Sequence, residues 1–350
     1  PAGLAGQDNS LQLFYTGIMP TGSYKYDLAG VDAPMESNLY STGGLIGVYG
    51  MDKFTFGLGV YVPAGLGAEY NGDDLVALSG AFGATSYDWL SEIGVVSISP
   101  TIAYQINEQF SVGLALNIYY AMFDLSRFNA LDLNGDMMPE TPTQYTEEST
   151  GIGYGVTLGL KYNVNDALSI GASFRTETAV TMEGTADFEA IALESDFERE
   201  VSWPMWIAGG LAYHVNDKFV ITADAQYSNW AALEELTAKY DDLPEDGVFT
   251  LEWEDATQIR LGGEYMITPE TALRAGYYYD PAPAPDETLN FLFPSSTNHV
   301  VTVGAGHDYG KYSVGVALEY LLGAERDVDP TADNAPGKHQ MDIFAFSLSF

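Results

Sequence analysis

The chain of 350 residues contains no cysteine, which excludes disulfide frameworks, thiolate metal sites and thiol-based catalysis. It is also short of positive charge, with 13 lysine and arginine residues against 49 acidic ones and a formal net charge of −36. A surface of this sign repels phosphate backbones, so nucleic-acid binding is excluded. The acidic excess has two interpretations that the sequence leaves open: solubility in a salty medium, or an outer surface loaded with cations.

Long hydrophobic runs are absent as well. Although 46% of the residues are hydrophobic, no run approaches the roughly 18 apolar residues that a membrane-spanning helix needs, so such a helix is excluded. Neither an initiator methionine nor a basic leader precedes Pro1, and we expect the natural chain to carry further residues upstream. What the sequence has in abundance is 37 glycines and 24 tyrosines, a combination that favours strands, tight turns and interfacial rings over helices.

Apolar residues alternate with small or polar residues in several long segments, which start at Phe110, Leu168, Phe219 and Tyr312. A period of two indicates β-strands, and runs of about ten residues match a tilted strand that crosses a bilayer. The strands of a soluble sandwich are shorter, so the pattern favours a closed transmembrane barrel. In the first segment the apolar positions are Phe110, Val112, Leu114, Leu116, Ile118, Tyr120 and Met122, and between them lie Ser111, Gly113, Ala115, Asn117, Tyr119 and Ala121.

A short polar turn recurs between these segments, as in YQINEQFSVG from Tyr104, YNVNDALSIG from Tyr162 and YHVNDKFVIT from Tyr213. Short turns alternate with long connections, which predicts an all-β fold of fourteen antiparallel strands with both ends on the short-turn side. Short periplasmic turns and long outer loops are typical of bacterial outer-membrane barrels. The short turns lie near 51–53, 107–109, 165–167, 216–218, 268–271 and 309–311, and the long connections near 20–43, 71–89, 129–150, 188–199, 233–249, 281–295 and 323–338.

The chain ends in MDIFAFSLSF, where Phe344, Phe346, Leu348 and Phe350 occupy one face. A terminal phenylalanine on an alternating strand resembles the tag by which outer-membrane barrels are recognised for assembly. We therefore expect the chain to reside in a bacterial outer membrane, among its lipids and lipopolysaccharide.

Four stretches resemble the FadL family of outer-membrane long-chain fatty acid transporters. PAGLAG at the amino terminus resembles the end of the family's hatch, and GLGVYVPAGLGAEYNG (residues 57–72) resembles its third strand. Residues 203–230 and 277–306 match family blocks late in the barrel. The resemblance implies a hatch segment over residues 1–9, including Pro1, Ala2 and Gly3, and a monomeric fourteen-stranded barrel over residues 10–350.

The resemblance also implies passive uptake of long-chain fatty acids or similar hydrophobic compounds, without a cofactor or a catalytic residue. In this family the ligand leaves sideways through an inward kink of the third strand. Pro63 cannot donate to the strand ladder, and glycines permit bends that a side chain would block. An ordinary strand end near a loop is the other interpretation of this segment. The resemblance places the kink at Pro63, Ala64, Gly65, Leu66 and Gly67.

The resemblance further implies a ligand pocket that includes Arg127, Phe128, Phe123 and Tyr119. A guanidinium can bind a carboxylate in bidentate fashion, and aromatic rings can line an acyl chain. The alternative is an arginine at the rim, paired to Asp124 or to an acidic residue of a loop. The lysine that the family places before the tenth strand has no counterpart in GVFTLEWED (residues 247–255), and this departure leaves room for a neutral hydrocarbon as ligand.

Other functions leave weaker signals. A barrel of the same family that serves as a structural partner in protein secretion is the alternative, and the segment VPAGLGAEY argues against the unkinked wall that it requires. No arrangement of serine, histidine and acid stands out for a lipid hydrolase.

DLNGD (residues 132–136) lacks the spacing and the closing glutamate of a calcium loop, and no metal site is predicted. The outer loops at residues 21–40 and 71–90 mix apolar and polar residues. This composition suits either a groove in which a hydrophobic ligand first binds or a lid over the barrel.

Overall fold

The computed structural model describes residues 1–133 and 138–350, apart from the side chains of Ala64 and Leu66. The DLNGD segment therefore lies largely outside the described residues. Among the residues that are described, no helix is long and apolar enough to cross a membrane.

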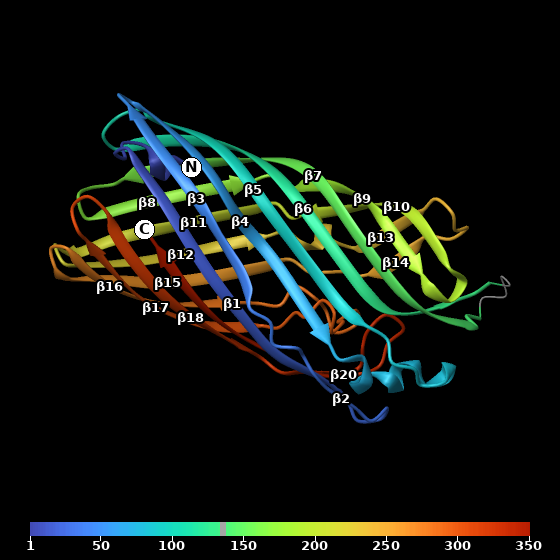
Figure 1. Cartoon of the computed structure of the whole chain (residues 1–350). Coiled ribbons are helices and arrows are strands. Elements are labelled where there is room, and N and C mark those ends of the chain that lie inside the picture. Colours follow the sequence, from blue (N-terminus) through green and yellow to red (C-terminus); the bar gives the residue numbers. More distant parts are fainter. Residues whose placement is uncertain (134–137) are drawn as a thin grey trace.

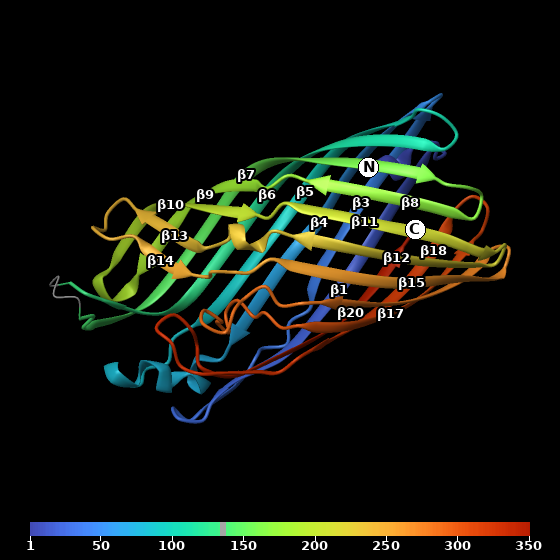
Figure 2. The same cartoon turned by 180° about the vertical axis from the view of Figure 1, so that it is seen from behind.

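Within the described part of the chain, fourteen strands form one closed antiparallel barrel, as predicted (Figure 1). The last strand closes on the first, where the backbones of Leu13 and Phe350 exchange hydrogen bonds of 3.0 and 2.9 Å. Four of the fourteen consist of two segments each, and these lie together on one side of the barrel (Figure 2). The single-segment strands are β1 (Ser10–Tyr26), β3 (Tyr40–Met51), β4 (Phe54–Tyr70), β5 (Trp89–Gln105), β6 (Phe110–Leu131), β7 (Thr141–Asn163), β16 (Thr271–Asp280), β17 (Asn298–Asp308), β18 (Ser313–Gly323) and β20 (Gly337–Ser349).

The strands with two segments combine a lower part near the periplasmic turns with an upper part near the outer loops. They are β8 (Leu168–Arg175) with β9 (Thr178–Phe188), β11 (Trp206–Asn216) with β10 (Leu193–Trp203), β12 (Phe219–Ser228) with β13 (Glu235–Tyr240), and β15 (Ala256–Thr268) with β14 (Gly247–Thr250). The remaining short elements do not belong to the barrel wall. They are β2 (Val31–Pro34), β19 (Arg326–Val328) and the 3-10 helices η1 (Ala2–Leu4), η2 (Gly72–Asp74), η3 (Val76–Phe82), η4 (Glu189–Ile191) and η5 (Trp230–Ala232).

The alternation of the sequence becomes an outer and an inner face. On β6, Leu114 and Leu116 expose 44% and 43% of their surface, whereas Ala115 and Asn117 between them expose 6% and 3%. Large apolar side chains on the outside and small or polar ones inside are what a barrel in a bilayer requires. The outer face of β6 is therefore the face that contacts lipid.

The recurring turn motif works through its asparagine. The side-chain Oδ1 of Asn107 accepts hydrogen bonds from the amides of Gln109 and Phe110 at 2.9 and 2.8 Å. Asn165 and Asn216 cap their turns in the same way, with bonds of 2.9 Å to the second residue beyond them. Side chains of this type stabilise a tight reversal because they replace backbone acceptors. Both chain ends lie at the end of the barrel that carries these turns (Figure 1).

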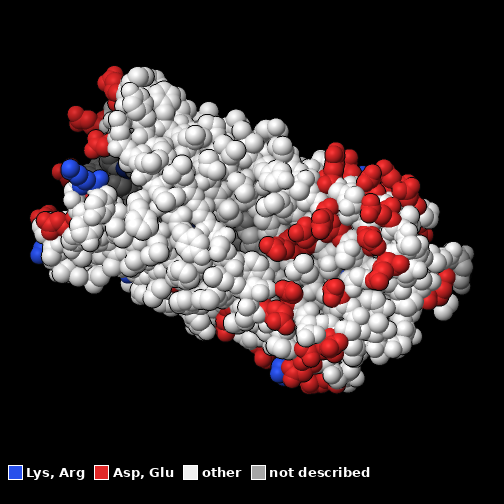
Figure 3. Space-filling view, viewed as in Figure 1, with Lys and Arg blue, Asp and Glu red and all other residues white. Residues whose placement is uncertain are grey.

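Several strands extend further than the predicted ten residues or so; β7 has 23. The connections predicted over 129–150 and 188–199 are consequently shorter, because strands occupy most of both ranges. The extensions carry acids on their outer face, and Glu92, Asp124 and Glu148 are direct neighbours across β5, β6 and β7. Figure 3 shows acidic residues gathered over the outer half of the molecule and an uncharged band beside them. Since charges are costly in hydrocarbon, this row of acids marks the outer edge of the lipid-facing belt.

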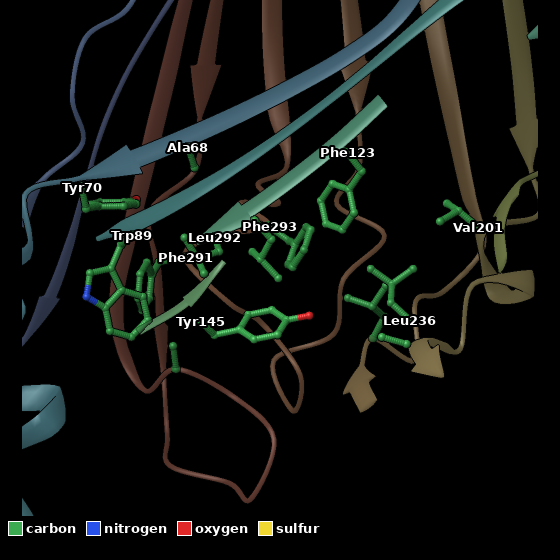
Figure 4. Packing of buried hydrophobic residues seen from close by; sticks show 14 of the residues in the cluster. Ala68, Tyr70, Trp89, Phe123, Tyr145, Val201, Leu236, Phe291, Leu292 and Phe293 are labelled. Carbon is green, nitrogen blue, oxygen red and sulfur yellow. The ribbon is translucent and has the colours of Figure 1, made fainter. Parts of the chain in front are cut away.

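An aromatic core packs inside the outer end of the barrel. The loop between β16 and β17 folds inward and places Phe291 against Tyr24, Tyr70 and Trp89, at ring-centroid distances of 4.6, 5.2 and 5.3 Å. Figure 4 shows this packing around Phe291 and, further along, Phe293 near Phe123. The loop thus forms a lid over the lumen.

Candidate functional site

β4, the third strand of the barrel, shifts its register against β5 where the sequence predicts a kink. Tyr61 pairs with Ser97 of β5, but the next pair is Ala64 with Val95, so β4 carries one residue more than β5 over this interval. The extra residue makes a β-bulge, which bends a strand and interrupts its ladder. Pro63 lies inside the bulge, where its missing amide hydrogen costs no ladder bond.

Beyond the bulge, β4 is paired on one side only. Its pairing with β3 ends at Gly44–Tyr61, whereas its pairing with β5 continues to Tyr70–Trp89. In the described residues the barrel wall therefore has an unpaired gap between β3 and the outer part of β4. The gap is closed above, where the amide of Glu36 donates to the carbonyl of Glu69 at 2.8 Å.

The side chain of Tyr40 lies in this gap. A Cβ built on Gly67 would lie 2.4 Å from the Tyr40 hydroxyl oxygen and 2.5 Å from its Cζ, so the ring packs on bare backbone. Gly67 is opposite the exposed Glu92 and therefore lies on the outer face of β4. Tyr40 shares the inner face of β3 with Gly44, four residues away. The ring of Tyr40 thus covers the outer face of β4 at Gly67, and an inward bend of β4 at this point stays a prediction.

An apolar cavity of about 210 Å³ lies behind the gap. Gly65 on the unpaired stretch of β4 forms part of its wall. In Figure 4, Phe123 and Phe293 lie on one side of this space, and Val201 and Leu236 on the other. The remaining lining residues, all apolar except Ser202, are Ile93, Val95, Trp203, Trp230, Leu233, Leu251 and Trp253.

A row of hydrogen-bonded polar side chains crosses the inner wall below the cavity. Ser97 and Ser99 share a bond of 2.8 Å, Ser99 donates to Asn117 at 3.0 Å, and Asn117 donates to Thr157 at 2.8 Å. All four side chains are buried. The apolar lining of the cavity therefore ends at a polar layer on the way to the periplasm.

The amino-terminal segment lies against the inner wall still further down. A Cβ on Gly113 of β6 would lie 2.4 Å from the backbone nitrogen of Ala2, and one on Gly159 of β7 would lie 2.9 Å from it. These glycines let η1 lie directly on the inner wall, a close approach that a side chain would prevent. The side chain of Gln7 holds the segment by donating to the carbonyl of Gly3 at 3.0 Å. A hatch role for residues 1–9, with Pro1 beside Gly159, stays a prediction.

The residues predicted to bind ligand are dispersed. Phe123 lines the cavity, whereas Tyr119 is buried lower on the same face of β6. Phe128 packs on the outer loop, with ring centroids 5.6 Å from Phe82 and 5.1 Å from Tyr87. The guanidinium carbon of Arg127 lies 5.3 Å from the ring centroid of Tyr145, and its Nη1 donates to the carbonyl of Phe128 at 3.4 Å. Of the four, Phe123 alone is among the residues that line the cavity.

Sequence reasoning missed a buried ion pair beside the cavity. Arg199 of β10 binds Glu147 of β7 through both guanidinium Nη atoms, one bond measuring 2.9 Å, and the two side chains expose 5% and 0% of their surface. Tyr145 donates to the same carboxylate, and Tyr240 donates to Tyr145 at 2.8 Å. The guanidinium also lies 5.3 Å from the ring centroid of Phe123. The positive charge next to the cavity is thus already neutralised.

Comparisons with known proteins agree with this architecture. A family model described as "Outer membrane protein transport protein (OMPP1/FadL/TodX)" matches residues 23–345. Outer membrane protein P1 of Haemophilus influenzae is 23% identical over 303 residues, covering 78% of this chain and 63% of that protein. The long-chain fatty acid transport protein of Salmonella typhi is 22% identical over 305 residues, covering 78% and 67%. The chain therefore spans about two thirds of the length of these relatives.

Among solved structures, the fold is similar to that of the toluene transporter TodX of Pseudomonas putida. The two superpose with a TM-score of 0.78 at 20% sequence identity, over 100% of this chain and 91% of that one. At this identity the similarity establishes the fold of the barrel.

Proposed function

Because the chain belongs to the OMPP1/FadL/TodX family of outer membrane transport proteins, we propose that it takes up small, neutral, apolar compounds by passive diffusion. The compound binds in the cavity behind β4 and leaves sideways, between β3 and β4, into the lipid. The family consists of transport proteins, so this chain is a transporter and not an enzyme.

The observation that carries the proposal is the position of Gly65. This residue belongs both to the lining of the cavity and to the stretch of β4 that has no partner on the β3 side. Without a side chain, its backbone is all that lies between the cavity and the gap at this point. The gap is thus a direct way out of the cavity between β3 and β4.

The chemistry on either side of the cavity favours the sideways exit. An apolar solute gains roughly 25 cal/mol for each Å² removed from water or from polar surroundings. Going down, it meets the polar row of Ser99 and Asn117; going sideways, it meets hydrocarbon. Gly67 pairs with Glu92 at the outer edge of the lipid belt, and Gly65 lies two residues, roughly 7 Å, deeper. The exit therefore opens into the outer leaflet.

Size and charge favour a small neutral compound. A dry apolar cavity of about 150 Å³ holds one benzene molecule, so about 210 Å³ suits a substituted single ring rather than a whole long acyl chain. Arg199 is paired with Glu147, and Arg127 does not line the cavity. Relatives are named for long-chain fatty acids and for toluene, and these features favour compounds of the second kind. Fatty acid uptake stays a prediction.

Filling the gap tests the proposal. A Cβ on Gly65 would meet only the carbonyl oxygen of Ile93, at 3.5 Å, so Gly65→Leu is expected to fold and to block the exit. Gly94→Leu is the matched control, because Gly94 faces Gly65 on the fully paired β5 and a Cβ there meets only Met122, also at 3.5 Å. The measurement is uptake of labelled toluene by a Gram-negative strain that lacks related transporters. Loss with Gly65→Leu and retention with Gly94→Leu is expected, and equal uptake by both would overturn the lateral exit.

A further inference from the structure

A second hollow, of about 440 Å³, lies on the surface beside the cavity. Three of its lining residues, Glu234, Glu235 and Glu252, are exposed acids, and none of the residues lining it is basic. The lining of this hollow is polar, whereas the lining of the cavity is apolar. The other lining residues are Ala231, Thr250 and Trp253.

One side chain, Trp253, lines both the surface hollow and the inner cavity. The two spaces are otherwise divided by neighbouring residues that face opposite ways. Leu233 and Leu251 line the cavity, whereas Glu234 and Glu252, each the next residue in the chain, line the hollow. The wall between the two spaces is therefore one residue thick, and Trp253 extends through it.

The wall at Trp253 is free of strand ladder. β12 and β15 are paired as far as Ser228–Ala256, and β13 and β14 start to pair at Glu235–Thr250. Between these pairs the chain makes irregular turns, in which Glu252 has a left-handed backbone with φ of 46°. The two segments are joined there by backbone hydrogen bonds from the amide of Glu252 to the carbonyl of Glu234 at 2.8 Å and from the amide of Trp253 to the carbonyl of Leu233 at 3.3 Å.

The indole of Trp253 is not tied by a polar contact. Among the described residues, its buried Nε1 has no hydrogen-bond partner. It packs edge-to-face on Trp230, with ring centroids 5.2 Å apart. The side chain of Trp253 also packs against two buried hydrophobic clusters, one of them formed by Ala284, Leu289 and Val328. Rotation of the indole therefore costs apolar packing but no side-chain hydrogen bond.

We propose that Trp253 is the gating residue at the entrance of the cavity, and that the acids around it select neutral over anionic compounds. This inference rests on the transport function proposed above. Rotation of the indole joins the hollow to the cavity. A carboxylate that enters the hollow is repelled by Glu234, Glu235 and Glu252, whereas a neutral ring of the same size is not.

Because the chain has no cysteine, one introduced thiol can block the hollow selectively. Glu235→Cys places a thiol in its wall, and intact cells are then treated with a maleimide carried on polyethylene glycol. Asp329→Cys is the control, because Asp329 is exposed in a different outer loop. Labelled Glu235→Cys is expected to lose toluene uptake, and labelled Asp329→Cys to keep it.

Charge selection is tested with toluene and benzoate, which match in size and differ in charge at pH 7. Replacing Glu234, Glu235 and Glu252 by glutamine is expected to raise benzoate uptake relative to toluene uptake by about tenfold. Trp253→Ala is expected to raise the initial rate for both probes, and Trp253→Phe to stay near the unmodified rate.

The outcomes separate the two proposals. If Gly65→Leu abolishes toluene uptake but labelled Glu235→Cys transports normally, the entrance lies elsewhere and only the Trp253 proposal fails. If both variants transport normally, the transport function proposed for the cavity fails as well. An unchanged ratio of benzoate to toluene in the glutamine variant overturns the selection by charge.

Discussion

Arg199 on β10 and Glu147 on β7 form a buried, bidentate ion pair inside the outer end of the barrel. The pair links strands that are not neighbours, since β9 lies between them. Its surroundings are aromatic, with the rings of Phe123 and Phe197 each 5.3 Å from the guanidinium carbon. It therefore fixes the shape of the upper barrel directly beside the cavity.

Breaking this pair by one substitution is expected to destabilise the barrel strongly. Glu147→Gln leaves the guanidinium of Arg199 buried without a counter-charge, and removing one partner of such a pair costs about 3–5 kcal/mol. The double change Arg199→Met with Glu147→Leu removes both charges and is expected to cost much less. The temperature at which the folded band disappears in semi-native gel electrophoresis measures both. A single variant as stable as the double variant would contradict the expectation.

Removing the ring that lies in the gap is expected to speed the exit. Tyr40→Ala uncovers Gly67 and widens the unpaired space between β3 and β4, so the initial rate of toluene uptake should rise. Tyr40→Phe keeps the ring and should behave like the unchanged protein. Tyr49→Ala is the control for loss of a tyrosine on the same strand, since Tyr49 exposes 57% of its surface on the lipid-facing side. A slower rate with Tyr40→Ala would show that the ring guides the ligand instead of obstructing it.

The polar row is expected to matter for stability and not for transport. Asn117→Leu removes the partner of Thr157 and one of the two partners of Ser99, which keeps its bond to Ser97. Leaving a buried polar group unsatisfied costs about 1–3 kcal/mol. Toluene uptake should persist, because the proposed exit lies above this row. Heat denaturation and uptake are measured on the same variant. If uptake fell as far as with Gly65→Leu, the ligand would have to pass down the lumen.

The barrel could be predicted from sequence because its signals are local. Each periplasmic turn is indicated by residues no more than four positions apart, as at Asn107 and Asn165. The alternation of apolar and polar residues in each strand can be recognised without knowing which strands lie beside it. The same alternation runs through ESDFEREV (residues 194–201), where Phe197, Arg199 and Val201 share a face. That face points inward, but the charged residues between them made the segment resemble a loop, so Arg199 was missed.

The cavity could not be predicted in the same way, because it is assembled from distant parts of the chain. Phe123, Trp253 and Phe293 meet there only once the barrel has closed and the loop after β16 has folded inward. Pro63 and the glycines predict a kink, and the ladder of β4 with β5 shifts its register at the same place. The one-sided pairing of β4 depends on the register of β3 and β5, which no single segment encodes.

The hydrogen-bonded row of Ser97, Ser99, Asn117 and Thr157 has a consequence for the cell that makes this barrel. The row spans three neighbouring strands on the inner wall beneath the cavity, and η1 packs on the same wall below it. An apolar compound that takes the sideways route proposed above does not cross this polar layer. For the cell, such a route would admit apolar compounds without opening a polar path along the axis of the barrel.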